Sequence, residues 1–315
     1  MKKIFCAVLA LAAMASCSKE YIVAEDKQAI GFGEAFVDNG TRADYSTDND
    51  VDKFLVYGTL TGYYDSVQIF KGAEVERPDD LTTGYNEEKA WICEETQYWV
   101  PNADYNFIAV VDGELNKEDG NYLNTINFTV EDGNANKDLL LATATASVEN
   151  DGTITGLNSK NLVAFSFNHL LSKVQFTVGS SIGNGYSIKV TDITVKGVAK
   201  DGIYTIDGEN SKWEQVQVGE STTTDLTFPV TANGTFETRQ ILPVTQTLNV
   251  TISYDIYFGN TKISKATKSG KITDKTFVKN TVYNIGATIT MANEIEFTVK
   301  EVNVWATPEQ NLDIQ

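Results

Sequence analysis

Short runs in which apolar and polar residues alternate recur through most of the chain. Valine, isoleucine, threonine, tyrosine and phenylalanine dominate these runs, and glycine or asparagine separates them. Examples are residues 162–178, 187–198, 248–258 and 280–291. A period of two is typical of half-buried β-strands, and no long stretch has the period of a helix. The pattern therefore predicts an all-β fold of the sandwich class, and 315 residues are enough for two sandwiches in tandem.

Turn signals lie between the runs at hairpin spacing. They are Asp151-Gly152, Asp201-Gly202, Asp207-Gly208, Asn233-Gly234 and Gly259-Asn260. The polar, glycine-containing stretch 147–161 interrupts the apolar pattern most clearly. We expect the boundary between the sandwiches there, with one sandwich over 43–150 and the other over 151–292. The apolar run in 136–146 fits a short helical turn or a buried strand, and its periodicity does not separate the two.

The first twenty residues, MKKIFCAVLALAAMASCSKE, have the organisation of a signal peptide. Lys2 and Lys3 precede an apolar run, residues 4–13, that is too short to remain as a membrane-spanning helix. Small residues then lead into Cys17, as in a bacterial lipobox. The pattern predicts a signal peptide over 1–16 and lipid on Cys17, whose acyl chains would hold the precursor in a membrane. The alternative is an ordinary signal peptide in which Cys17 has no role.

The formal net charge of the chain is −18. A field of this sign repels nucleic acid, so we expect no nucleic-acid partner. Of the three cysteines in the sequence, Cys6 is removed with the predicted signal peptide. Cys93 then has no partner for an intramolecular disulfide if Cys17 carries lipid. Stability must then come from a packed core.

A first strand is predicted within residues 29–40, AIGFGEAFVDNG. Ile30, Phe32 and Phe36 share one side of this strand, while the other side carries mainly glycine, alanine and valine. The acidic linker that follows has no pattern capable of burial, and Arg42 is the basic residue that stands before it. Exposed polar linkers of this kind are where proteases act.

The C-terminal segment, residues 293–315, has two apolar faces. Ile295, Phe297 and Val299 share one parity, and Val302 and Val304 share the other. The extra residue at Lys300-Glu301 predicts a bulge or a break between two short strands.

The order of these motifs resembles the fimbrillin family of Bacteroidales, which comprises type V pilins and related surface lipoproteins. The resemblance extends from residue 1 to about residue 305. It rests on the lipobox, the short strand followed by TRA at residues 41–43, the segment YWVPNADYNFIAV, the run DLLLA and the segment FSFNHLLSKVQFTV. It implies two transthyretin-like β-sandwiches. It also implies that an arginine-specific protease cuts after Arg42. Residues 17–42, which include the first strand, would then be a propeptide, and the mature subunit would begin at Ala43.

By the same resemblance, the segment 293–315 is a donor strand that fills the groove of a neighbouring subunit. The alternative is that it is simply the last strand of the second sandwich. The resemblance implies an outer-membrane lipoprotein precursor, then an extracellular fimbrium, with other pilin subunits as partners.

The sequence is compatible with three functions. The first is a structural stalk pilin, the second a tip adhesin that binds a host or bacterial surface ligand, and the third a surface lipoprotein that binds glycan without polymerising. Exposed aromatic residues between Trp91 and Phe107 would favour glycan binding, but their alternation with polar residues predicts that they belong to the core.

Enzymatic and metal sites are not indicated, and no cofactor is expected. His169 is the only histidine, and the sequence places no acid to orient its imidazole toward Ser172. The acidic residues of 48–52 resemble the opening of a calcium loop, but Lys53 stands where glycine is needed. Ser66 lies in a DSV triplet, a weak signal for O-glycosylation. Six lysines in 260–280 are expected to protect a sheet edge, with a partner-docking surface as the alternative.

Overall fold

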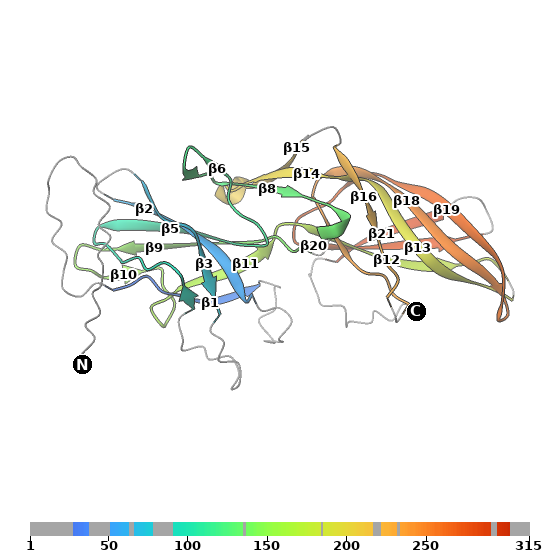
Figure 1. Ribbon diagram of the computed structural model, residues 1–315, viewed down its shortest axis with the longest axis horizontal. Coiled ribbons are helices and arrows are strands. Elements are labelled where there is room, and N and C mark those ends of the chain that lie inside the picture. The colour runs from blue at the N-terminus through green and yellow to red at the C-terminus, as the bar shows by residue number, and fades with distance from the viewer. Residues whose placement is uncertain are drawn as a thin grey trace, which may run out of the picture.

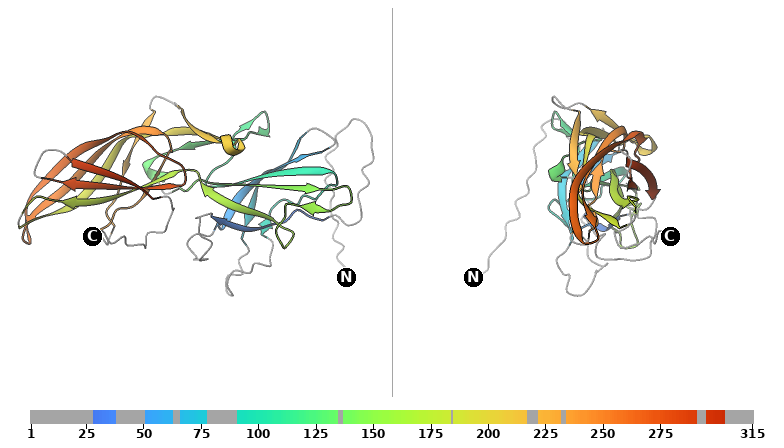
Figure 2. Two further views of the ribbon diagram at one scale, coloured as in Figure 1. Left: turned by 180° about the vertical axis from the view of Figure 1, so that it is seen from behind. Right: turned by 90° about the vertical axis from the view of Figure 1, so that its right-hand side faces the viewer.

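A computed structural model of the chain describes residues 28–37, 51–62, 66–77, 91–134, 137–183, 185–216, 222–231, 234–290 and 295–302. These residues form β-strands and turns, with single turns of 3₁₀ helix at η2 (Asp132–Asn134) and η3 (Gly208–Asn210). The predicted all-β fold is confirmed. The strands gather into two lobes along the longest axis of the molecule (Figures 1 and 2). No helix in the described ranges is long and apolar enough to cross a membrane.

The first lobe is built on one eight-stranded sheet. In order across the sheet its strands are β1 (Phe32–Val37), β11 (Val163–His169), β9 (Leu140–Val148), β5 (Ala103–Val111), β2 (Lys53–Thr61), β3 (Val67–Glu76) and β4 (Ile92–Cys93), and β10 (Ile154–Thr155) pairs with β9. Alternate residues of β5 and β11 are buried, as their period of two predicts. The core of this lobe is therefore made by the inner face of a curled sheet.

The second lobe contains two four-stranded sheets. The first has the order β17 (Arg239–Ile241), β12 (Ser172–Ser180), β20 (Thr281–Ile289) and β21 (Ile295–Val302). The second has the order β16 (Thr223–Thr227), β13 (Tyr186–Ala199), β18 (Thr245–Phe258) and β19 (Thr261–Thr276). Strands β13 and β18 include the predicted stretches 187–198 and 248–258, and β20 lies within 280–291. The predicted stretch 162–178 divides into β11 and β12.

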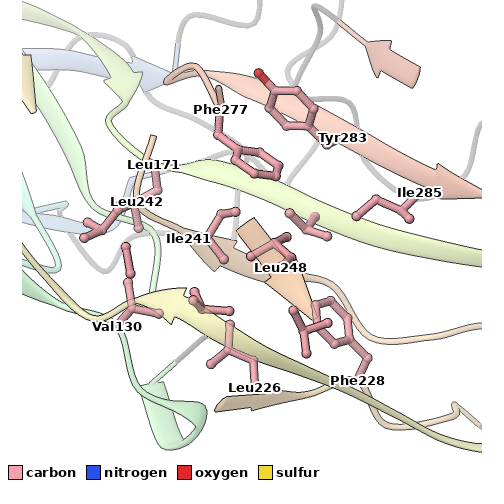
Figure 3. Packing of buried hydrophobic residues seen from close by; sticks show 14 of the residues in the cluster. Val130, Leu171, Leu226, Phe228, Ile241, Leu242, Leu248, Phe277, Tyr283 and Ile285 are labelled. Carbon is pink, nitrogen blue, oxygen red and sulfur yellow. The ribbon is translucent and has the colours of Figure 1, made fainter. Parts of the chain in front are cut away.

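Buried side chains from both sheets fill the space between them (Figure 3). The sheet that contains β16 and β18 contributes Leu226 and Leu248, and Phe228 follows β16 directly. The other sheet contributes Tyr283 and Ile285 from β20, and each of these five side chains is at most 1% exposed. Because apolar burial is worth about 25 cal/mol per Å², this interior is the main source of stability for the lobe.

A smaller sheet ties the two lobes together. Its strands are β15 (Lys212–Val216), β14 (Asp201–Thr205) and β8 (Thr125–Thr129). It joins β8 from the first half of the chain to β14 from the second half, and next to it β6 (Lys117–Glu118) and β7 (Asn121–Tyr122) form a short hairpin.

The strand pairing places the boundary between the lobes later than predicted. β9 ends at Val148 and β11 begins at Val163, yet both belong to the first sheet, and the intervening stretch contains the β9–β10 hairpin. The chain crosses to the second lobe between His169 and Ser172. A division after residue 150 would cut one sheet, so that limit is corrected, while the other predicted domain limits remain predictions.

Two local predictions are settled by the strands. The apolar run in 136–146 enters a strand, β9, and not a helical turn. The turn predicted at Asp201-Gly202 is wrong, because both residues begin β14. A Cβ atom on Gly202 would lie 3.0 Å from both Trp213 and Leu242, so this glycine allows close packing.

Tyr57 of β2 joins the core of the second lobe from the first sheet. Its hydroxyl accepts a hydrogen bond from the backbone N–H of Leu115 at 3.2 Å, and burial raises the pKa of Tyr57 to about 12 despite this bond. The folded-state pKa lies above the unfolded value of about 10. The contribution of the neutral Tyr57 side chain to the free energy of unfolding is therefore complete below pH 10 and is lost as the pH rises toward 12.

We therefore expect the free energy of unfolding to fall between about pH 10 and 12, and to fall less steeply in Tyr57→Phe. Urea unfolding at pH 8 and pH 11 measures this, with Tyr98→Phe, an exposed tyrosine, as the matched control. An identical pH dependence in Tyr57→Phe and the unchanged protein would contradict the expectation.

Candidate functional site

The first strand, β1, is held by backbone hydrogen bonds on both sides. On one side it runs parallel to β11, with Phe32 opposite Val163 and a bond from Val163 N–H to the carbonyl of Gly31 at 2.9 Å. On the other side the N–H of Ile30 donates to Gln97 O at 2.8 Å, and the N–H of Trp91 donates to the carbonyl of Phe32 at 2.9 Å. The strand thus fills a slot between β11 and the segment 91–99.

Phe32 is the central apolar contact of this slot. Its side chain is 0% exposed, and its ring centroid lies 5.3 Å from that of Phe70, 5.9 Å from Phe107, 6.0 Å from Phe165 and 6.5 Å from Phe54. Edge-to-face and stacked contacts at these distances add to the stabilisation from buried area. A single residue of the first strand is therefore surrounded by four aromatic rings from the rest of the lobe.

Ile30 and Phe32 lie on the inner face of the first strand as predicted, but Phe36 does not. Ile30 is 6% exposed, whereas Phe36 is 37% exposed and Ala35 takes the buried place. The pairing with β11 shifts register between Phe32 and Ala35, and this shift reverses which parity points inward.

The aromatic residues between Trp91 and Phe107 are mostly core residues, as their alternation predicted. Trp91, Trp99, Tyr105 and Phe107 are each less than 9% exposed, and only Tyr98 of this set is open to solvent. These buried rings cannot form the sugar-stacking surface that the glycan-binding alternative needs.

Among the described residues, the C-terminal strand, β21, lies at the edge of its sheet and pairs with β20 alone. Ile295 is buried, and Phe297 and Val299 are half-buried against the core, so these three residues share the inner face as predicted. The ring of Phe297 lies over Gly270 of β19, where a Cβ atom would approach it to 2.5 Å. An ion pair between Lys275 and Glu301 also joins β19 to β21.

No bulge separates two short strands at Lys300-Glu301. β21 continues through these residues to Val302, which pairs with Val282, without a change of register. That prediction is wrong because pairing with β20 holds the backbone extended across residues 295–302. Within this one chain, residues 295–302 occupy the last-strand position that was the alternative to donation.

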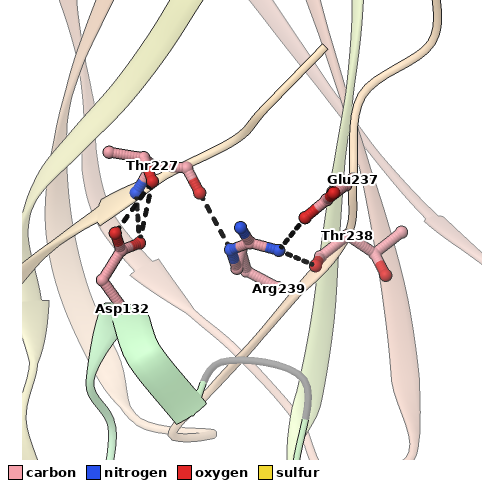
Figure 4. A network of polar contacts seen from close by, with 5 residues as sticks. All are labelled: Asp132, Thr227, Glu237, Thr238 and Arg239. Atoms are coloured by element: carbon pink, nitrogen blue, oxygen red, sulfur yellow. Dashed lines mark hydrogen bonds and ion pairs between the residues drawn. The ribbon is translucent and has the colours of Figure 1, made fainter. Parts of the chain in front are cut away.

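Arg239 is buried within the second lobe (Figure 4). Its Nε donates to the carbonyl of Thr227 at 2.8 Å, and its Nη1 donates to Glu237 Oε2 at 2.9 Å and to the carbonyl of Thr238 at 3.0 Å. Beside it, the carboxylate of Asp132 accepts from the N–H of Thr227 at 2.7 Å. This network fixes η2 to the end of β16.

Arg77 at the end of β3 is held by Asp52. Its guanidinium is ion-paired with the Asp52 carboxylate, and its backbone N–H donates to the Asp52 carbonyl at 2.8 Å. Pro78 follows it directly in the sequence. Both arginines that the structure describes are therefore held by ion pairs and hydrogen bonds within the fold.

His169 does have an acid beside it, contrary to the expectation from sequence. Asp138 lies 2.8 Å from Nδ1 of His169, brought there by the pairing of β11 with β9. Ser172, however, is 0% exposed, and its Oγ donates to the carbonyl of Val278 at 2.8 Å. The serine is thus committed to a structural hydrogen bond inside the core.

Several predicted functional residues lie outside the described part of the chain. They are Cys17, Arg42, Ala43 and Val304. Val302 is described through its backbone pairing in β21. The roles of these residues stay predictions.

The fold is shared with solved structures of bacterial surface proteins. A fimbrial protein from Bacteroides vulgatus superposes with a TM-score of 0.55 at 17% identity, over 89% of this chain and 100% of that chain. A putative cell adhesion protein from Bacteroides ovatus superposes with a TM-score of 0.57 at 13% identity, over 90% and 99%. One from Bacteroides uniformis gives 0.54 at 16% identity, over 89% and 99%. At such identities the likeness shows the fold.

The search of curated proteins found no match to this sequence. The family comparison is more informative, because the fimbrillin-like family model matches residues 41–305, which is most of the chain. The chain belongs to the fimbrillin-like family.

Proposed function

We propose that this chain is a structural pilus subunit for cell adhesion, exported as an outer-membrane lipoprotein precursor with lipid on Cys17. An arginine-specific protease then cuts after Arg42, and the subunit polymerises by donor-strand exchange with other pilin subunits in an extracellular fimbrium. The observation that carries the proposal is β1. β1 is a buried strand that lies shortly before Arg42 in the sequence, so one cut after Arg42 would separate it from the rest of its lobe. Membership of the fimbrillin-like family supports a non-enzymatic role in the pilus.

Loss of β1 would leave a groove with a defined chemistry. Its floor would be the rings of Phe54, Phe70, Phe107 and Phe165, which now surround Phe32. Its walls would be the backbones of β11 and the segment 91–99, both with hydrogen-bonding groups that β1 now satisfies. A groove of this kind is a template for an added strand.

β21 carries apolar residues at the spacing that the groove requires. Ile295 and Phe297 repeat the Ile-x-Phe triplet of Ile30 and Phe32. As an edge strand, β21 can leave its own sheet without interrupting an internal ladder. In the proposed polymer Phe297 takes the place of Phe32, Ile295 that of Ile30, and Val299, Val302 and Val304 extend the donor strand.

Arg42→Ala is expected to abolish both cleavage and polymerisation. Arginine-specific cleavage requires an arginine before the cut, and the described arginines are engaged by the fold. Incubation of the purified precursor with an arginine-specific protease, followed by mass spectrometry and electron microscopy, measures both effects. Arg77→Ala is the control and should be processed and polymerise normally. Polymers from protease-treated Arg42→Ala would contradict the proposal.

The Arg42→Ala protein should also resist the same protease while folded. Arg239 is 5% exposed and hydrogen-bonded, and Arg77 is ion-paired and precedes proline. After denaturation in urea, we expect cleavage after Arg239. Rapid cleavage at Arg239 under native conditions would show that the fold does not protect it.

A further inference from the structure

The tip of the second lobe carries a cluster of lysines. Lys189 and Lys265 lie opposite Asp255 on the two strands that flank β18, and Nζ of Lys262 is 2.6 Å from Asp255 Oδ2. Asp255 is only 8% exposed, whereas Lys189 and Lys265 are exposed. Lys262 is thus ion-paired with Asp255, and two further exposed lysines lie on the neighbouring strands, in a chain whose net charge is −18.

Exposed apolar side chains lie within the same tip. Tyr186, Phe258 and Ile263 are 44%, 55% and 52% exposed, and the rings of Tyr186 and Phe258 have centroids 5.2 Å apart. We call these three residues and the lysines Lys189, Lys262 and Lys265 the lysine tip. Exposed aromatic and apolar residues together with charged ones are a common composition of protein interfaces.

Three exposed acidic residues lie together at the opposite end of the described part of the chain. Asp104 at the start of β5, Glu149 after β9 and Asp151 in the β9–β10 turn are all exposed, and Ala103 pairs with Val148 beside them. Residues 100–106 and 147–153 contain no lysine or arginine. Hydrogen bonds from Thr153 hold the pKa of Asp151 below its usual value. We call Asp104, Glu149 and Asp151 the acidic tip.

The two tips lie at opposite ends of the long axis. In Figure 1, the β18–β19 hairpin is at one end and β10, which follows the acidic turn, is near the other. Opposite charges at opposite ends allow a head-to-tail contact, and such a contact repeats indefinitely because it does not close on itself.

We propose that the lysine tip of one subunit docks against the acidic tip of a second copy of this chain. The inference rests on the proposed function, since it concerns how pilus subunits approach and orient before strand exchange. Contacts between exposed charges mainly raise the rate of association and fix orientation, while the exchanged strand supplies the lasting attachment.

The test compares two double variants with the same change in charge. Lys189→Glu with Lys265→Glu alters the lysine tip and leaves the Lys262–Asp255 pair in place. Lys196→Glu with Lys212→Glu alters two exposed lysines away from the lysine tip, on β13 and β15. After protease treatment at low salt, light scattering should show polymerisation slowed about tenfold or more by the tip variant and little changed by the control. In about 1 M salt, where charges are screened within about 3 Å, the difference should vanish.

A second measurement uses the uncleaved protein and does not depend on polymerisation. Sedimentation velocity at high protein concentration should show reversible association at low salt, lost in the tip variant and in Glu149→Lys with Asp151→Asn. The asparagine keeps the acceptor for the Thr153 N–H. Equal behaviour of the tip variants and the unchanged protein would overturn the inference. Failure of the unchanged subunit to polymerise would overturn the proposed function. Association of the uncleaved chain would still show whether the lysine tip binds the acidic tip.

Discussion

Phe32→Ala is expected to lower the free energy of unfolding of the uncleaved chain by about 3–5 kcal/mol. Phe32 is 0% exposed and contacts four aromatic rings, so its truncation leaves a cavity that rigid neighbouring strands cannot readily fill. Urea unfolding followed by tryptophan fluorescence measures the change.

Phe36→Ala is the matched control on the same strand. Phe36 is 37% exposed, so the same substitution should cost less than about 1 kcal/mol. A similar loss from both variants, or no loss from Phe32→Ala, would contradict the assignment of Phe32 as the residue that fixes β1 in its slot.

Phe297→Asp is expected to prevent polymerisation of the cleaved subunit while the uncleaved chain stays folded. In the proposed donor position a carboxylate would be buried among aromatic rings without a partner, which costs several kcal/mol. In the single chain, by contrast, Phe297 is half-buried on an edge strand, where the charge can reach water. Polymer formation by electron microscopy and thermal unfolding of the precursor measure the two effects.

Val278→Asp adds the same charge to an exposed position of the second lobe and should polymerise normally. Global unfolding of the Phe297→Asp precursor would instead indicate that β21 serves only as the last strand of its own sandwich.

Much of the fold follows from local pattern. The period of two in the stretches that became β13, β18 and β20 predicted strands because each has one face on the core. The predicted boundary failed because a polar, glycine-rich stretch is equally suited to a hairpin turn, and only the pairing of β11 with β9 shows that the sheet continues beyond it.

The candidate site was predictable where burial follows strict alternation. Ile30 and Phe32 were identified in this way, and so were Ile295, Phe297 and Val299. Phe36 was misplaced because the register shift after Phe32 depends on pairing with β11, which is distant in sequence. The acid beside His169 was missed for the same reason, since Asp138 reaches it only through the pairing of two strands.

Treatment of the purified precursor with an arginine-specific protease is the most direct test of assembly by strand exchange. N-terminal sequencing should then find a chain that starts at Ala43, and electron microscopy should show that this chain forms polymers. A product that starts elsewhere, or a chain cut after Arg42 that stays monomeric with residues 293–315 intact, would contradict assembly by exchange of β21 for β1.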